Sequence, residues 1–432
     1  MTRRRTHRVE DLAALVARAR RQGIRELGQR GVNRLYRAMD VGQLEFPLLP
    51  GDVMDSRRLQ LPVPDATPPT DRPARVGWVC TPPAAGSGGH TTLIRMIIEV
   101  ERQGHECVLF LYDRHGGDIR RQERTIREHW PELRATVQNA SAGIRGVDAA
   151  VASGWQTAHA LARHSGDAAM RRLYFIQDYE PYFYPRGSLY ALAEDSYRFG
   201  FRPLALGHMV AELLRSEVGV EPDVVEFGCD TSVYSLTNAG NRAGVVFYEK
   251  PGNDRRGYVL GRLALEEFHR THPDQPIHLY GGAGSHWTIP VIRHGRLTPA
   301  ELNRLYNQTV AGIAMSFTNI SLVAEEMLAA GTIPIINDAA TARADLAHSE
   351  AVWALPTPSG IAEALAATVS APGQRERAKR AAAGARAGWD ATAQNVAALI
   401  LAEIYTGPLG GPAPEAARRE PPLAVGSEQY GR

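Results

Sequence analysis

Residues 75–113 of the sequence read RVGWVCTPPAAGSGGHTTLIRMIIEVERQGHECVLFLYD. The stretch begins with a short apolar run, passes through a glycine-containing loop into a segment with helical spacing of apolar residues, and ends with a second apolar run. Two buried strands joined by a helix form a parallel βαβ unit, because parallel strands need a long crossover connection. The stretch therefore predicts an α/β domain whose parallel sheet is covered by helices on both faces.

The same alternation continues along the chain in two series. Four more apolar runs of the first series lie at residues 147–153, 171–178, 202–207 and 223–227. Six runs of the second series lie at residues 244–250, 276–282, 291–296, 309–316, 332–338 and 350–356. Because 432 residues exceed the usual size of one core, we expect two Rossmann-like domains in tandem, over 75–230 and 231–372.

The segments outside these two domains differ from them in composition. Residues 1–46 form a basic segment with helical spacing, in which the first 37 residues hold 11 arginines and three acids. Residues 47–74 contain seven prolines and predict an extended linker. Residues 373–405 predict Ala/Arg-rich helices, and residues 406–432, rich in proline and glycine, are expected to be disordered.

The composition argues against several classes of protein. A formal net charge of +2 does not require a nucleic-acid partner. Cys80, Cys107 and Cys229 are too few and too far apart to predict a disulfide framework or a cysteine metal site. There is no long apolar stretch and no signal peptide, so we expect a cytoplasmic protein. The basic first segment is either a solvated helix on the main body or a peripheral contact to anionic lipid at the inner membrane face.

The loop of residues 82–92 is a candidate ligand site. Gly88 and Gly89 allow close approach of the backbone to a ligand, and the helix that begins near His90 offers free N–H groups to an anion or a sugar hydroxyl. A Walker phosphate loop is excluded because no lysine precedes Lys250. Two alternatives remain for the loop: a tight turn that binds nothing, and the dinucleotide site of an oxidoreductase with Asp113 as its ribose-binding acid.

Residues 250–256, Lys-Pro-Gly-Asn-Asp-Arg-Arg, follow directly after an apolar run. A lysine at the carboxyl end of a parallel strand, with Arg255 and Arg256 at the start of the next helix, suits the oxygens of a phosphorylated ligand. Only two of the 49 basic residues are lysines, whereas the chain otherwise uses arginine, so an ordinary surface position here would be expected to carry arginine. Cations at a helix start oppose the helix dipole, which makes a merely solvated cluster the weaker interpretation.

The segment of residues 174–188 places acids and tyrosines just beyond a predicted strand. Asp178 or Glu180 could act as a general base there. Tyr179, Tyr182 and Tyr184 could form a platform for a sugar or could simply pack against the body of the protein.

A polar loop and a helix with two glutamates occupy residues 316–338. The second glutamate, Glu326, is placed to accept hydrogen bonds from a ribose diol at the upper edge of the sheet. A pair of glutamates on a helix is also typical of a solvated surface, so the segment alone does not decide between the two interpretations.

Together these segments resemble the GT-B glycosyltransferases of the large retaining family 4. Residues 224–234 (VVEFGCDTSVY) are similar to the interdomain segment of that family, and residues 324–338 (AEEMLAAGTIPIIND) to the segment that holds the nucleotide ribose; residues 247–256 (FYEKPGNDRR) carry the likeness further. Residues 87–113 and 174–185 look most like bacterial rhamnosyltransferases that use dTDP-L-rhamnose. The resemblance implies two Rossmann-like domains facing a cleft, with C-terminal helices that cross back to the first domain.

The resemblance also implies roles for individual residues. Lys250 with Arg255 or Arg256 would face the diphosphate and Glu326 the ribose, and we take Asp178 as the candidate base. The residues expected to bind the donor or to line the sugar side are Glu326, Gly295, Arg296, Leu297, Thr318, Asn319, Ser321, Gly88, Gly89 and His90. One departure is that Thr318 stands where the family has the first glutamate of its pair, so that carboxylate is missing. A deoxysugar donor, with fewer hydroxyls to anchor, tolerates this loss.

The resemblance implies transfer of a hexosyl group, L-rhamnose from dTDP-L-rhamnose, to a hydroxyl of a glycan, a lipid-linked glycan or a natural product, with retention. The cations would stabilise the departing diphosphate, so no metal and no further cofactor are expected. The alternatives are a non-catalytic sugar-nucleotide-binding protein and the oxidoreductase described above.

Overall fold

The computed structural model describes residues 46–84, 86–282, 286–319, 322–385 and 388–407. The chain divides into two compact units, residues 1–53 and 54–432. The described part of the first unit holds one short helix, η1 (Pro50–Asp52). The helices expected in residues 1–45 and the disorder expected after residue 407 lie outside the described residues.

The second unit contains two parallel sheets, which confirms the expected α/β fold class. The first sheet has the order β3-β2-β1-β4-β5-β6-β7 and the second the order β10-β9-β8-β11-β12-β13. The strands of the first sheet are β1 (Arg75–Cys80), β2 (Glu106–Leu111), β3 (Thr136–Asn139), β4 (Ala149–Ala152), β5 (Arg171–Ile176), β6 (Arg202–Leu206) and β7 (Asp223–Val225). The strands of the second sheet are β8 (Val245–Glu249), β9 (Ile277–Gly281), β10 (Ile292–Arg293), β11 (Ala311–Ile313), β12 (Ile333–Asn337) and β13 (Val352–Ala354).

Helices connect these strands, as parallel pairing requires. In the first half they are α4 (Gly88–Arg102), α5 (Ile119–His129), η2 (Ala140–Ala142), α6 (Trp155–His164), η3 (Glu180–Phe183), α7 (Ser188–Ser196), α8 (His208–Leu213) and η4 (Leu214–Val218). In the second half they are η5 (Asp254–Arg256), α9 (Tyr258–Thr271), α10 (Pro299–Gln308), α11 (Leu322–Ala329), α12 (Ala340–Asp345), α13 (Pro358–Ser370), α14 (Gln374–Ala383) and α15 (Asp390–Tyr405). Within the described part of the chain, no helix is both long and apolar enough to cross a membrane.

Helices cover both faces of the second sheet. Successive residues of a strand point to opposite faces, so neighbouring residues pack against different helices. Val245 and Phe247 of β8 pack in one apolar cluster with α9 and α13, whereas Val246 between them belongs to another cluster with α10 and α11. Near-continuous apolar strands, not alternating ones, are therefore what this sheet requires. This explains why the apolar runs in the sequence locate its strands.

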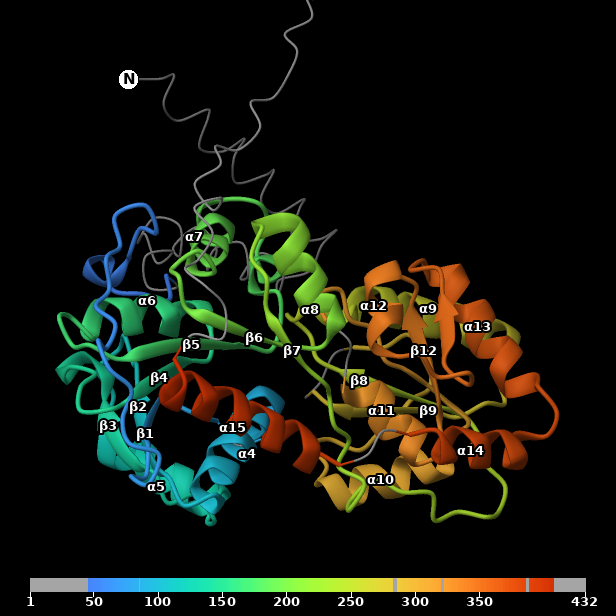
Figure 1. The fold of residues 1–432 in the computed structure, drawn as a ribbon. Coiled ribbons are helices and arrows are strands. Elements are labelled where there is room, and N and C mark those ends of the chain that lie inside the picture. The colour runs from blue at the N-terminus through green and yellow to red at the C-terminus, as the bar shows by residue number, and fades with distance from the viewer. Residues whose placement is uncertain (1–45, 85, 283–285, 320–321, 386–387, 408–432) are drawn as a thin grey trace, which may run out of the picture. The chain divides into compact units, whose positions relative to one another are not determined.

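The chain crosses between the halves a second time after α14. Helix α14 packs against α11 of the second half, but α15 packs against α4 of the first (Figure 1). Ile400 and Ile404 of α15 are buried in the same apolar cluster as Ile97 and Val100 of α4. At the end of the helix, Arg202 of β6 forms an ion pair with Glu403 at 3.1 Å. The last helix of the chain is thus part of the first half.

The strand order reverses between β1 and β4 in the first sheet and between β8 and β11 in the second. In open parallel sheets, ligands bind at the carboxyl ends of strands that flank such a reversal, because the two connections leave in opposite directions. The segments after these strands begin at residues 81 and 153 in the first half, and at residues 250 and 314 in the second. Those after β1, β8 and β11 contain, or lead directly into, residues that the sequence singled out.

Candidate functional site

Three cations, Lys250, Arg255 and Arg256, lie beyond the carboxyl end of β8; we call them the cationic cluster. The segment turns so that η5 presents both arginines before α9 begins. Gly257 makes this turn with a φ of +64°, and a Cβ atom there would lie 2.6 Å from Cε of Met315. A glycine is therefore needed to bring the arginines against the neighbouring loop after β11.

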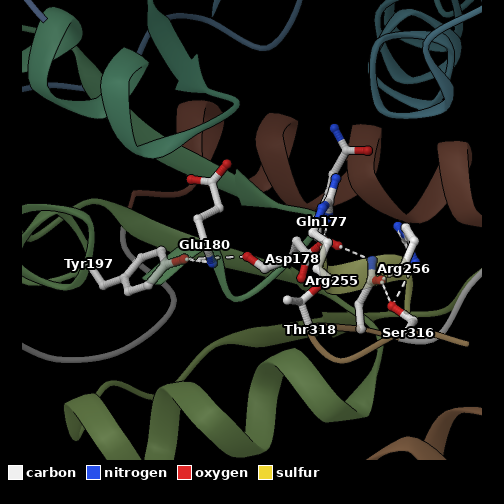
Figure 2. Close-up of polar contacts among 9 residues, drawn as sticks. Gln177, Asp178, Glu180, Tyr197, Arg255, Arg256, Ser316 and Thr318 are labelled. Atoms are coloured by element: carbon white, nitrogen blue, oxygen red, sulfur yellow. Dashed lines mark hydrogen bonds and ion pairs between the residues drawn. The ribbon is translucent and has the colours of Figure 1, made fainter. Parts of the chain in front are cut away.

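Arg256 is held by that neighbouring loop. Its guanidinium donates to Oγ of Ser316 at 2.6 Å and to Oδ1 of Asn319 at 3.4 Å (Figure 2). Burial, and next the charge of Arg255, lower the pKa of Arg256 to about 10. Neither of its partners carries a negative charge, so this guanidinium remains uncompensated by its own contacts.

Arg255 instead reaches a carboxylate from the first half. Its Nη1 lies 2.6 Å from Oδ2 of Asp178, which follows β5, and its guanidinium carbon lies 4.3 Å from the ring centroid of Phe183. Thr318 donates to the same Asp178 oxygen at 3.0 Å. Burial raises the pKa of Asp178, and the charges of Arg255 and Arg256 oppose that shift. Asp178 thus joins the connections after β5, β8 and β11 (Figure 2).

Gln177 makes a second link between the halves. Its carbonyl oxygen accepts from Nδ2 of Asn319 at 3.2 Å, while its side-chain amide donates to the carbonyl of Gly89 in the first turn of α4 at 3.1 Å. Gly88, Gly89 and His90 open that helix. Gly89 of the glycine loop is therefore linked through Gln177 to Asn319.

The ring of His90 is held from both sides. Its Nδ1 lies 2.9 Å from Oγ of Ser87, and its Nε2 lies 3.4 Å from Oγ1 of Thr81. Burial lowers the pKa of this imidazole. The two hydroxyls fix the ring at the first turn of α4, so that it shapes this side of the site.

Lys250 differs from the two arginines in having no anchoring contact. Among the described residues, none forms a hydrogen bond or an ion pair with its Nζ atom, which lies 6.0 Å from the ring centroid of Tyr248. Partial burial and the charges of Arg255 and Arg256 lower its pKa. Within the part of the chain that the structure describes, Asp178 is the sole carboxylate paired with any member of the cationic cluster. The cluster therefore carries excess positive charge that an anionic ligand would neutralise.

Glu326 lies on α11, after β11, and has surroundings of its own. Burial, and next the charge of Asp230, raise the pKa of Glu326 to about 8, while Arg95 and a hydrogen bond with Tyr234 oppose that shift. Arg95 in turn forms an ion pair with Asp230 and lies over the ring of Trp389. Glu326 therefore adjoins the segment that connects the two halves, and at pH 7 its carboxyl holds a proton.

We expect Glu326→Gln to flatten the pH dependence of stability. The folded protein keeps the Glu326 proton up to about pH 8, whereas the unfolded chain releases it near its ordinary pKa of 4.5. The free energy of unfolding should therefore fall as pH rises through this window, and glutamine removes that part of the slope. Urea denaturation at pH 6 and pH 8.5 measures it. The slope should not vanish, because burial also raises the pKa of Glu180 to about 8; an unchanged slope would refute the shift at Glu326.

The residues expected beside the nucleobase lie at the carboxyl end of β9. The carbonyl of Gly295 accepts from the amide of Gly281 at 2.7 Å, with Arg296 and Leu297 following. One strand over, the buried Glu249 carboxylate binds Arg293 at 2.6 Å and Trp287 at 2.9 Å. These contacts tie β10 and the segment before it to the strand that precedes Lys250. Ser321, also expected at the site, lies outside the described residues.

The structure decides between three pairs of alternatives that the sequence leaves open. Tyr179 is fully buried and packs against Tyr197, so it offers no platform to a sugar. The carboxyl of Glu180 accepts from the Trp155 amide and from Tyr174, and it points away from Asp178 (Figure 2), so it is not the base. The side chain of Asp113 accepts from the backbone amides of His115 and Gly117 in its own turn and from the side chain of Gln122 on α5, so it is not placed as the ribose acid of an oxidoreductase.

The sequence does not single out two residues of the site, Gln177 and Ser316. Gln177 directly follows β5, and Ser316 is the first polar residue beyond β11. A polar residue just beyond a buried strand is the available signal in both cases. Their partners lie 88 and 60 residues away, which the local sequence does not show.

Two family models match the chain. Residues 134–206 match the one described as WsaF, N-terminal domain, and residues 243–366 match WsaF, C-terminal domain. Among curated proteins, the O-antigen biosynthesis protein RfbC of Myxococcus xanthus is 32% identical over 267 residues, which are 59% of this chain and 21% of that protein. The matched region thus spans about a fifth of the length of that relative.

Several solved structures share the fold. Sucrose-phosphate synthase from Thermosynechococcus elongatus has a TM-score of 0.59 at 14% identity, covering 76% of this chain and 98% of that one. Anabaena HepE in complex with UDP and glucose has a TM-score of 0.58 at 14% identity, covering 76% of this chain and 99% of that one. A glycosyltransferase from Rickettsia africae has a TM-score of 0.55 at 12% identity, covering 77% of this chain and 98% of that one. These likenesses show the two-domain Rossmann-like GT-B fold.

Proposed function

We propose that this chain is a glycosyltransferase that moves a hexosyl group from a nucleoside-diphosphate sugar to a hydroxyl acceptor. The observation that carries the proposal is the cationic cluster: three positive groups at the strand-order reversal of the second sheet, paired with a single described carboxylate. A diphosphate supplies the missing negative charge, and arginine and lysine suit its oxygens.

The same cluster acts in the reaction. As the bond between the anomeric carbon and the diphosphate oxygen breaks, negative charge grows on the leaving group, and fixed cations stabilise it without reorganisation. The acceptor oxygen forms the new bond to the anomeric carbon with retention. Asp178, within the same cluster of contacts, takes the proton of the acceptor hydroxyl. Glu326 binds the ribose of the donor.

The matches to the two WsaF domains and to an O-antigen biosynthesis protein support transfer in the building of a bacterial glycan. HepE, with the same fold, was solved with UDP and glucose, which supports a nucleotide-linked donor here. The finer proposal is dTDP-L-rhamnose as donor. We place the reaction in the cytoplasm, with a glycan or lipid-linked glycan as acceptor and with peripheral membrane contact through residues 1–46.

Donor binding and turnover test the proposal separately. In thermal-shift measurements, dTDP or UDP at 100 times its dissociation constant should stabilise the fold by about 2.7 kcal/mol. Purified protein with dTDP-L-rhamnose and a panel of glycan and lipid-linked acceptors should then release dTDP and form a glycoside with the donor's anomeric configuration, visible by NMR. Stabilisation without turnover on any acceptor would favour a non-catalytic sugar-nucleotide-binding protein. No stabilisation by any nucleoside diphosphate would refute the donor site.

A further inference from the structure

Arg255 has two roles that conflict. The proposed function assigns it to the donor diphosphate, yet its Nη1 lies 2.6 Å from Asp178. The Asp178 side chain is 9% exposed, so this is a largely buried ion pair, whereas the Arg255 side chain remains 29% exposed. A guanidinium with an open side can accept a second anion, but that anion will lie close to the first.

The separation between the two anions follows from the geometry of the guanidinium. A phosphate oxygen bound to the free nitrogen of Arg255 would lie on the order of 5 Å from the Asp178 carboxylate. In a partly buried site two negative charges at that distance repel strongly, because little water screens them. Lys250 and Arg256 attract the diphosphate to this place, so the repulsion cannot be avoided by binding elsewhere.

We propose that the Asp178 carboxylate competes with the donor diphosphate for Arg255, and that diphosphate binding releases this carboxylate from its ion pair. The inference rests on the proposed function. Thr318, which donates to the same oxygen at 3.0 Å, holds the carboxylate in place after Arg255 turns to the phosphate. Once Arg255 has turned to the phosphate, the Asp178 carboxylate loses its charge partner and becomes a stronger base for the acceptor's proton. Donor binding first and acceptor activation second are thus coupled through one side chain.

Binding of dTDP and of inorganic pyrophosphate to Asp178→Asn, measured by isothermal titration calorimetry, tests the competition. Asparagine keeps the shape and can still accept from Thr318, but it does not hold Arg255 as a charge partner. We expect both ligands to bind about tenfold more tightly than to the wild type, while turnover is lost. If Asp178 merely oriented Arg255 toward the phosphate, the same variant would bind more weakly, and the proposal would be overturned.

Glu350→Gln is the matched control. Glu350 is a largely buried carboxylate. It pairs with two arginines of α14, Arg377 at 2.8 Å and Arg380 at 2.6 Å. The substitution changes the net charge by the same amount as Asp178→Asn, and diphosphate affinity should stay unchanged. An equal gain in both variants would show an effect of net charge and would refute the competition.

A double-mutant cycle locates the effect on one guanidinium. In the wild-type background Asp178→Asn is expected to increase the binding free energy of the diphosphate. In an Arg255→Gln background the same substitution should give less than half of that increase, because the guanidinium for which the two anions compete is gone. A full gain in that background would contradict the proposal. Failure of the competition can be told from failure of the proposed function. A wild type that binds neither dTDP nor pyrophosphate refutes the donor site. A wild type that binds both ligands, together with an Asp178→Asn variant of unchanged affinity, refutes only the competition.

Discussion

Lys250→Ala is expected to lower kcat by about 10²–10³-fold while the protein stays folded. The ammonium group forms no hydrogen bond or ion pair among the described residues, so its removal costs the folded state little. Its positive charge, by contrast, is what remains available to a leaving diphosphate. Steady-state kinetics with the donor, together with a thermal melt, separates the two effects.

Lys379→Ala is the natural control, because Lys379 is the other lysine of the chain. It lies exposed on α14 and pairs with Glu376 at 2.8 Å. Its loss should leave kcat unchanged. Normal turnover in Lys250→Ala, or a matching loss in Lys379→Ala, would remove the basis for assigning Lys250 to the diphosphate.

Arg256→Gln should lower kcat by about 10²-fold and weaken dTDP binding. The guanidinium bridges Ser316 and Asn319, and none of its direct partners carries a negative charge. Glutamine keeps a donor for Ser316 but removes the charge. Kinetics and calorimetry on the purified variant measure both losses.

Arg256→Lys separates charge from geometry in the same position. An ammonium keeps the charge but cannot span the two loop partners, so we expect it to restore part of the affinity and little of the rate. Arg380→Gln, at an ion pair with Glu350 in the second half, is the control for loss of an arginine and should turn over normally. Full activity of Arg256→Gln would show that this arginine serves only to hold the loop.

The sheets were predictable because buried parallel strands are continuous apolar runs. Five of the six strands of the second half and six of the seven in the first fall on such runs. The exceptions are the edge strands β3 (Thr136–Asn139) and β10 (Ile292–Arg293), which are largely exposed; β10 is still expected, from the mixed segment 291–296, whereas β3 is not. An edge strand with one neighbour needs no apolar run, so its sequence gives no such signal.

The site was predictable only where its residues follow strands directly. Lys250 and Arg256 could be found because they lie beyond β8, and the carboxyl ends of parallel strands gather at one edge. The pairing of Asp178 with Arg255 and Thr318 could not, since these residues come from different halves, 77 and 140 residues apart in the chain. The sequence also could not decide whether Asp178 or Glu180 is the general base, because the answer depends on which of the two carboxyls the Trp155 amide binds.

The return of α15 to the first half limits how the molecule can be taken apart. Its isoleucines and Trp389 complete an apolar surface that α4 begins more than 280 residues earlier. A fragment cut near residue 230 would leave that surface bare to water, and exposed apolar patches of this kind favour aggregation. Expression of the first half alone therefore calls for a fusion that carries residues 388–407, whereas the remaining segment would end with α14.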